Sequence, residues 1–174
     1  MKLQFVSPVL SELDALEAEA LACTVWQDAR PCDGVAALCD WRFSGRLSRL
    51  MVRGTLTGEL GEVMLVPGRP RISFEKLLLF GAGPRASFDE ARFQGVLRDM
   101  LTTLEGLACK SAVLELPGRQ CDLIPAERAA DRLLEAVTAA NARHASWTLV
   151  EGHDARRRIE QHMIEERRRV RPAP

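Results

Sequence analysis

The chain has 174 residues, a length typical of a single domain. Its 24 basic and 24 acidic residues cancel, so no overall electrostatic field would draw in nucleic acid or an anionic membrane surface. No apolar run approaches the ~20 residues of a membrane-spanning helix, and acidic residues interrupt the N-terminal stretch where a signal peptide would have its apolar core. We therefore expect a cytoplasmic protein without a membrane segment.

The first half of the chain alternates short apolar runs with helical patterns. Apolar residues predict strands at Leu3–Val6 and Leu21–Trp26, and 3.6-residue spacing predicts a helix over Pro8–Glu19 between them. Asp33 is a suitable N-cap for a second helix, which should bend at Gly45. This alternation is typical of a sheet covered by helices.

Two further strands are expected close together in the middle of the chain. The glycines and threonines of Arg53–Gly61 predict a loop, after which Glu62–Val66 and Leu77–Phe80 read as strands. The residues between these strands are too few for a crossover helix, so the pair should be antiparallel. The sheet is therefore predicted to be mixed.

A glycine turn, Gly81-Ala82-Gly83, follows the second of these strands and leads into a long amphipathic helix. Ser87 and Glu90 have the spacing of a capping box at the start of that helix. We interpret the glycines as a tight turn that requires positive φ. The alternative is a ligand-binding loop whose backbone N–H groups hold a phosphate at a helix N-terminus.

The second half continues the alternation. Strands are predicted at Ala112–Leu116 and Trp147–Val150, a helix begins at Pro125 between them, and a highly charged helix over Ala155–Arg169 ends the chain. The complete order, β-α-β-α-β-β-α-β-α-β-α, predicts a three-layer α/β/α sandwich with a mixed, mostly parallel sheet. We expect this domain to span residues 1–150, with a charged C-terminal helix and tail over 151–174.

Several of these features together resemble the N-terminal domain of the cytosolic leucyl aminopeptidases, the M17 metallopeptidases. They are a helix opened by Asp33-Gly34, then Phe43-Ser44-Gly45, the turn Thr57–Glu62 before a strand, and the strand and glycine turn Lys76–Gly83. The resemblance spans about Leu3–Asn141. It implies a macro-like α/β/α fold and, as in that family, a domain that helps to shape an assembly.

The resemblance does not imply peptidase activity. The family holds its two metals and catalytic groups in a separate C-terminal domain, and none of its metal-ligand motifs, such as NTDAEGR, occurs in this sequence. We therefore expect no catalytic residue, metal or cofactor, and a stand-alone domain that acts in assembly or partner binding. Two alternatives are a macro-type module for a nucleotide or ADP-ribose, and an aminopeptidase-related accessory subunit. The asparagine-rich loop of macro domains is missing, since Asn141 is the only asparagine.

The last predicted helix is a candidate interaction element. Ile159, Met163 and Val170 form an apolar stripe too narrow for a deep core position but suited to a seam between helices. We expect it to dock on its own domain or to support self-association, most simply as a symmetric dimer, or contact with another protein. The arginines of this helix alternate with glutamates, which argues against a nucleic-acid surface.

Metal binding has little support in the sequence. His162 and Glu166 lie one helical turn apart, but no third ligand accompanies them, and a solvated helix face explains both. The five cysteines are widely spaced and form no CxxC pair. We interpret them as buried thiols rather than as disulfides or zinc ligands.

Overall fold

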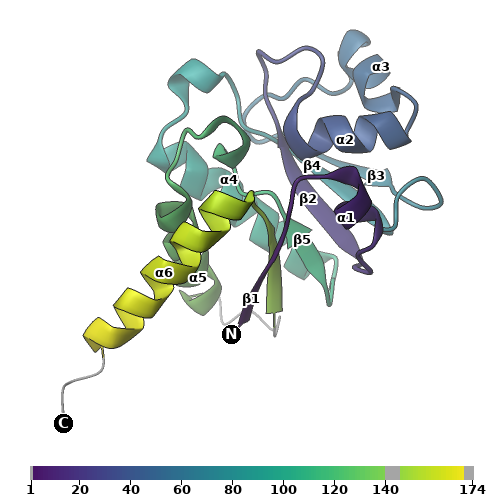
Figure 1. The fold of residues 1–174 in the computed structure, drawn as a ribbon. Coiled ribbons are helices and arrows are strands. Elements are labelled where there is room, and N and C mark those ends of the chain that lie inside the picture. Colours follow the sequence, from purple (N-terminus) through teal and green to yellow (C-terminus); the bar gives the residue numbers. More distant parts are fainter. Residues whose placement is uncertain (1, 140–145, 171–174) are drawn as a thin grey trace.

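The computed structural model describes residues 2–139 and 146–170, apart from the side chains of Lys2, Ser146 and residues 167–170. In this part of the chain, six strands form one sheet in the order β1-β6-β5-β2-β4-β3 (Figure 1). Every neighbouring pair is parallel except β3 and β4. The strands are β1 (Lys2–Val6), β2 (Ala20–Val25), β3 (Val63–Pro67), β4 (Lys76–Gly81), β5 (Ala112–Leu114) and β6 (Ser146–Val150). The mixed, mostly parallel sheet is therefore confirmed.

Helices cover both faces of this sheet. One face packs on α4 and α5, the other packs on α1, α2 and α3, and α6 lies against the outer side of α5 (Figure 1). The helices are α1 (Leu10–Asp14), α2 (Gly34–Arg42), α3 (Arg46–Val52), α4 (Glu90–Gly106), α5 (Ala126–Ala139) and α6 (His153–Val170), with 3₁₀ turns η1 (Arg85–Ser87) and η2 (Arg119–Cys121). The structure confirms the three-layer α/β/α architecture.

The central strands are apolar on both faces because helices cover them on both sides. All six residues of β2 are buried. In β4, Leu77 and Leu79 face the layer of α1–α3, whereas Leu78 and Phe80 face α4 and α5. All five cysteines are free thiols and four of them are buried. Among the described residues, no helix is both long and apolar enough to cross a membrane.

Two predicted helices differ from the observed ones. The first covers only Leu10–Asp14 instead of Pro8–Glu19. Its extension is excluded because the backbone of Glu19 already bonds to the sheet, with its N–H on the Ser111 hydroxyl and its C=O on the Lys76 N–H. The expected bend in the second helix is a complete break between α2 and α3, where Gly45 has φ of 75°.

The predicted capping box at α4 is wrong. The N-cap is Asp89, whose carboxylate accepts a hydrogen bond from the Arg92 N–H at 2.9 Å. Ser87 lies in η1 instead. Phe88 between them has an extended backbone, and its ring packs edge-on against Trp26. Because this extended residue separates Ser87 from the helix, Ser87 cannot be its N-cap. Glu90 forms ion pairs with two arginines of α5 rather than closing a box.

The two glycines of the turn after β4 are required for different reasons. Gly83 has φ of +74°, as predicted for a tight turn. Gly81 does not have positive φ, and in that respect the prediction is wrong. A Cβ at Gly81 would lie 1.9 Å from the Glu59 carbonyl oxygen, so the absence of a side chain lets the preceding loop cross the end of β4.

We predict that alanine at Gly81 destabilises the fold more than alanine at Gly83. The Gly83→Ala substitution should lower the free energy of unfolding by about 1–2 kcal/mol through its left-handed backbone. The Gly81→Ala substitution should lower it further, because backbone atoms must move apart. The measurement is urea denaturation. Gly95→Ala in α4 is the control, since nothing lies within 4 Å of its Cβ position, and it should raise stability by about 0.5–1 kcal/mol. Equal losses at Gly81 and Gly83 would contradict the steric explanation.

Candidate functional site

The backbone N–H groups of the predicted glycine loop are already used in hydrogen bonds to other parts of the chain. The three N–H groups of residues 81–83 donate to carbonyl oxygens of the protein at 2.8–3.0 Å. These acceptors belong to Glu62, Val25 and Gly58. A phosphate held by these donors would require the turn to open first.

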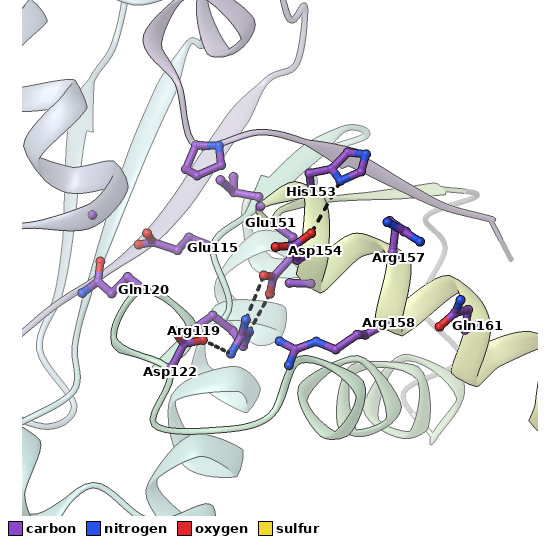
Figure 2. A pocket seen from close by; sticks show the side chains of 15 residues that line it. Glu115, Arg119, Gln120, Asp122, Glu151, His153, Asp154, Arg157, Arg158 and Gln161 are labelled. Atoms are coloured by element: carbon purple, nitrogen blue, oxygen red, sulfur yellow. Dashed lines mark hydrogen bonds and ion pairs between the residues drawn. The ribbon is translucent and has the colours of Figure 1, made fainter.

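A cleft of about 840 Å³ lies elsewhere, beside the C-terminal ends of β5 and β6 (Figure 2). The segment after β5 contributes Glu115 and Arg119, and the end of β6 leads into Glu151. Gly34 at the start of α2 and the first turns of α6 complete the walls. The C-terminal ends of parallel strands are the usual place for ligands in open α/β sheets.

Glu115 is a buried carboxyl group on the wall between this cleft and α2. Its side-chain oxygens accept hydrogen bonds from the Val35 N–H at 3.0 Å and from the Thr24 N–H at 3.4 Å. Burial raises the pKa of Glu115 to about 8, although both hydrogen bonds act to lower it. Glu115 therefore joins β5 to β2 and to the N-terminus of α2, largely as a neutral acid at pH 7.

The amide of Gln120 is oriented by a second carboxylate. Its Nε2 donates to Asp33 at 3.1 Å, and Asp33 also forms an ion pair with Arg85. The opposite end of the amide, Oε1, is buried without a hydrogen-bond partner among the described residues. A Cβ at Gly34 would meet both this atom and Glu115 Oε1, so the two oxygens are neighbours.

Arg119 and Glu151 form a buried ion pair on the floor of the cleft (Figure 2). Arg119 Nε and Nη2 donate to the two carboxylate oxygens at 2.8 and 3.1 Å. Its Nη1 donates to the Ile124 carbonyl at 2.6 Å and to Asp122. Burial acts to lower the pKa of Arg119, but these acidic partners leave it raised. The pair joins η2 to the end of β6.

Comparison with known proteins assigns this chain to a family. The model of the cytosol aminopeptidase family, N-terminal domain, matches residues 23–144. The chain belongs to this family. A "Probable cytosol aminopeptidase" of Pseudomonas fluorescens (strain SBW25) is 36% identical over 84 residues, which are 48% of this chain and 17% of that protein. The chain thus spans about a fifth of the length of the curated relatives it matches.

Solved structures agree with the cytosol aminopeptidase assignment at the level of the fold. A mutant tomato leucine aminopeptidase has a TM-score of 0.63 and 12% identity, and the match covers 94% of this chain and 35% of that one. The Trypanosoma brucei macrodomain in complex with ADP-ribose has a TM-score of 0.68 and 12% identity, covering 92% and 68%. The resemblance to the aminopeptidase N-terminal domain and the macro-like fold are both confirmed.

The predicted interaction helix of this aminopeptidase-type domain packs on its own core. Ile159 is fully buried with two alanines of α5, and Met163 is half-buried beside them. The side chain of Val170 lies outside the described residues. His162 approaches Asp131 of α5 at 2.8 Å. A role for this stripe in self-association stays a prediction, and it cannot use Ile159 unless α6 moves.

The charged groups of the cleft were not among the predicted site residues. Glu151 directly follows the predicted strand Trp147–Val150, a position where polar side chains meet at the C-terminal edge of a sheet. Glu115 lay inside the predicted strand Ala112–Leu116, whereas the observed β5 already ends at Leu114. The sequence therefore carried this signal for Glu151 but not for Glu115. It did not indicate the partner of either, because Val35 is 80 residues from Glu115 and Arg119 is 32 residues from Glu151.

The buried charged groups that line the cleft of the aminopeptidase-type domain already have partners within the described part of the fold. Among the described residues, no group of His, Cys, Asp or Glu side chains is arranged to hold a metal ion. Glu115 has the raised pKa of a candidate acid, but both of its oxygens already bind backbone N–H groups. Arg119 already donates four hydrogen bonds to acidic and carbonyl partners.

We predict that Glu115 makes the fold less stable as pH rises. Its folded-state pKa of about 8 exceeds its ordinary 4.5, so its contribution is complete below pH 4.5, falls between these values and levels off above about 8. The change should reach at most about 1.4 kcal/mol for each pH unit in that window. Urea denaturation at several pH values should show that Glu115→Gln removes this dependence. The exposed Glu105→Gln substitution should keep the wild-type profile. A pH profile unchanged by Glu115→Gln would refute the buried, neutral acid.

Proposed function

We propose that this chain is a non-catalytic cytosol aminopeptidase N-terminal domain, in the cytoplasm, that acts by binding protein in an assembly. The observation that carries the proposal is the exposed apolar edge of the sheet. β3 is the last strand on its side, and Val63 and Leu65 on it are 44% and 46% exposed. Open strand edges are a common site of protein association.

The family assignment supports the same proposal. The matching family model describes the N-terminal domain, and the tomato aminopeptidase structure superposes over only 35% of its own length. The chemistry of the cleft is compatible with this role, because its buried charges are paired within the fold. These observations favour a structural or partner-binding domain over one that performs a reaction.

We expect the purified protein to show no hydrolysis of leucine amides in the presence of manganese or zinc. A two-metal hydrolase requires several converging carboxylates and nitrogen ligands, and the described residues present no such cluster. The measurement is release of the amine product from a chromogenic leucine amide. Metal-dependent turnover that survives repurification and is lost in Glu115→Gln or His162→Ala would overturn the proposal.

A second candidate is a macro-type module for a nucleotide or ADP-ribose. The cleft favours it, because about 840 Å³ at the C-terminal edge of the sheet can accommodate such a molecule. The Trypanosoma brucei macrodomain that shares this fold was solved with ADP-ribose. The absence of the asparagine-rich loop from the sequence argues against this candidate.

We expect ADP-ribose to leave the melting temperature unchanged if protein binding is the function. Thermal unfolding with ADP-ribose or ADP would measure this. Arg157→Glu tests the cleft, since Arg157 is exposed on its wall, and Arg98→Glu on α4 is the matched control. A rise in melting temperature that Arg157→Glu abolishes and Arg98→Glu preserves would establish the nucleotide module instead.

A further inference from the structure

The outer edge of β3 presents unused backbone groups. The Gly81 N–H donates to the Glu62 carbonyl and the Gly68 N–H donates to the Glu75 carbonyl, which fixes the hydrogen-bonding alternation along the antiparallel pair of β3 and β4. Even-numbered residues of this segment therefore bond to β4. The N–H and C=O groups of Val63 and Leu65 point away from the sheet, toward the open edge.

The same two residues carry exposed apolar side chains. Val63 lies opposite Phe80 and Leu65 lies opposite Leu78, so both are on the sheet face covered by α4 and α5. Each nevertheless remains nearly half exposed at the margin of the sheet, and Leu60 in the preceding turn is 50% exposed. A strand paired along this edge would cover them.

The opposite edge of the sheet, β1, differs in this respect. Its apolar residues Leu3, Phe5 and Val6 pack into the core clusters of the domain. β1 therefore offers backbone groups but little exposed apolar surface. Pairing with another strand would therefore bury more apolar surface at β3 than at β1.

Charges on the two sides of β3 have opposite sign. Exposed Glu59 precedes the strand, and exposed Arg69 and Arg71 follow it. None of the three forms an ion pair with another of the described residues. An antiparallel copy of the same segment would bring the acidic end of one beside the basic end of the other. The segment is thus complementary to itself.

We propose that β3 pairs antiparallel with β3 of a second copy of this chain, across a two-fold axis at Met64. The proposal rests on the proposed protein-binding function and names its partner. In this register Val63 of one copy exchanges both backbone hydrogen bonds with Leu65 of the other, and their side chains meet on one face. Glu59 then lies level with Arg69 of the second copy. Such an isologous contact closes as a dimer.

Pro67 is compatible with this register. It has no N–H to donate, so it cannot take part fully in a ladder. Pairing centred on Met64 uses both backbone groups of Val63 and Leu65 and only the carbonyl of Pro67. The proline therefore ends the intermolecular ladder instead of preventing it.

The test compares Leu65→Lys with Val52→Lys by light scattering and sedimentation over a wide range of protein concentration. Val52 on α3 is 88% exposed and apolar, so its substitution has the same chemistry away from the edge. The wild type and Val52→Lys should have twice the mass of one chain, and Leu65→Lys should have the mass of one. Unchanged circular dichroism would show that both variants are folded.

Amide hydrogen exchange provides a second readout at single residues. The Val63 and Leu65 N–H groups should exchange more slowly as the concentration of the wild type rises, but not in Leu65→Lys. A wild-type protein that is monomeric at high concentration, or a dimer that Leu65→Lys leaves intact, would refute the pairing. Neither result would contradict the proposed non-catalytic role, which the leucine-amide assay tests separately.

Discussion

The constraint on which the rest of this structure depends is the burial of its central strands on both faces. β2 is buried along its whole length and β4 along nearly all of it, so neither can carry a charged side chain in its interior. Charged groups are therefore displaced to the strand ends. Glu115 follows β5 and Glu151 follows β6, and each is buried where it emerges. Burying a charge costs free energy unless the charge is paired or neutralised. The two glutamates avoid this cost in different ways. Glu151 is paired with Arg119, whereas Glu115 is held largely as a neutral acid against the start of α2.

The C-terminal edge of the sheet is divided by this arrangement into a closed half and an open half. At the end of β4, the absence of a side chain at Gly81 lets the loop carrying Glu59 cross directly over the strand. The carboxylate of Glu62 holds that loop through the N–H groups of Thr57 and Gly58. The cleft lies instead beside the ends of β5 and β6. The glycine turn thus lies where a loop covers the end of β4, and the cleft lies at the ends of β5 and β6.

Two surfaces of the domain therefore offer different chemistry. Most residues that line the cleft are charged or polar, and the buried carboxyl groups among them bond to β2, to the start of α2 and to Arg119, so they join separate elements of the fold. The β3 edge is apolar and has backbone groups directed outward. α6 is not equivalent to that edge, because Ile159 is already covered by α5. A partner can therefore contact the apolar residues of β3 without any change in the fold, whereas contact with Ile159 would require α6 to move.

Local pattern in the sequence by itself determined the layers of this protein. Alternating apolar runs and helical spacing predicted the strands and most helices, and the short connection between Glu62–Val66 and Leu77–Phe80 predicted the antiparallel pair, because chain length alone excludes a crossover helix. Only the tertiary structure decided which atoms meet. Asp89 is the cap in place of Ser87 because Ser87 lies in η1 and the extended Phe88 separates it from the helix, and Gly81 is required because a loop crosses it. The cleft likewise depends on contacts such as Glu115 with Val35, which are far apart along the chain. Periodicity records which face of an element is buried, but it carries no information about which distant residue covers that face.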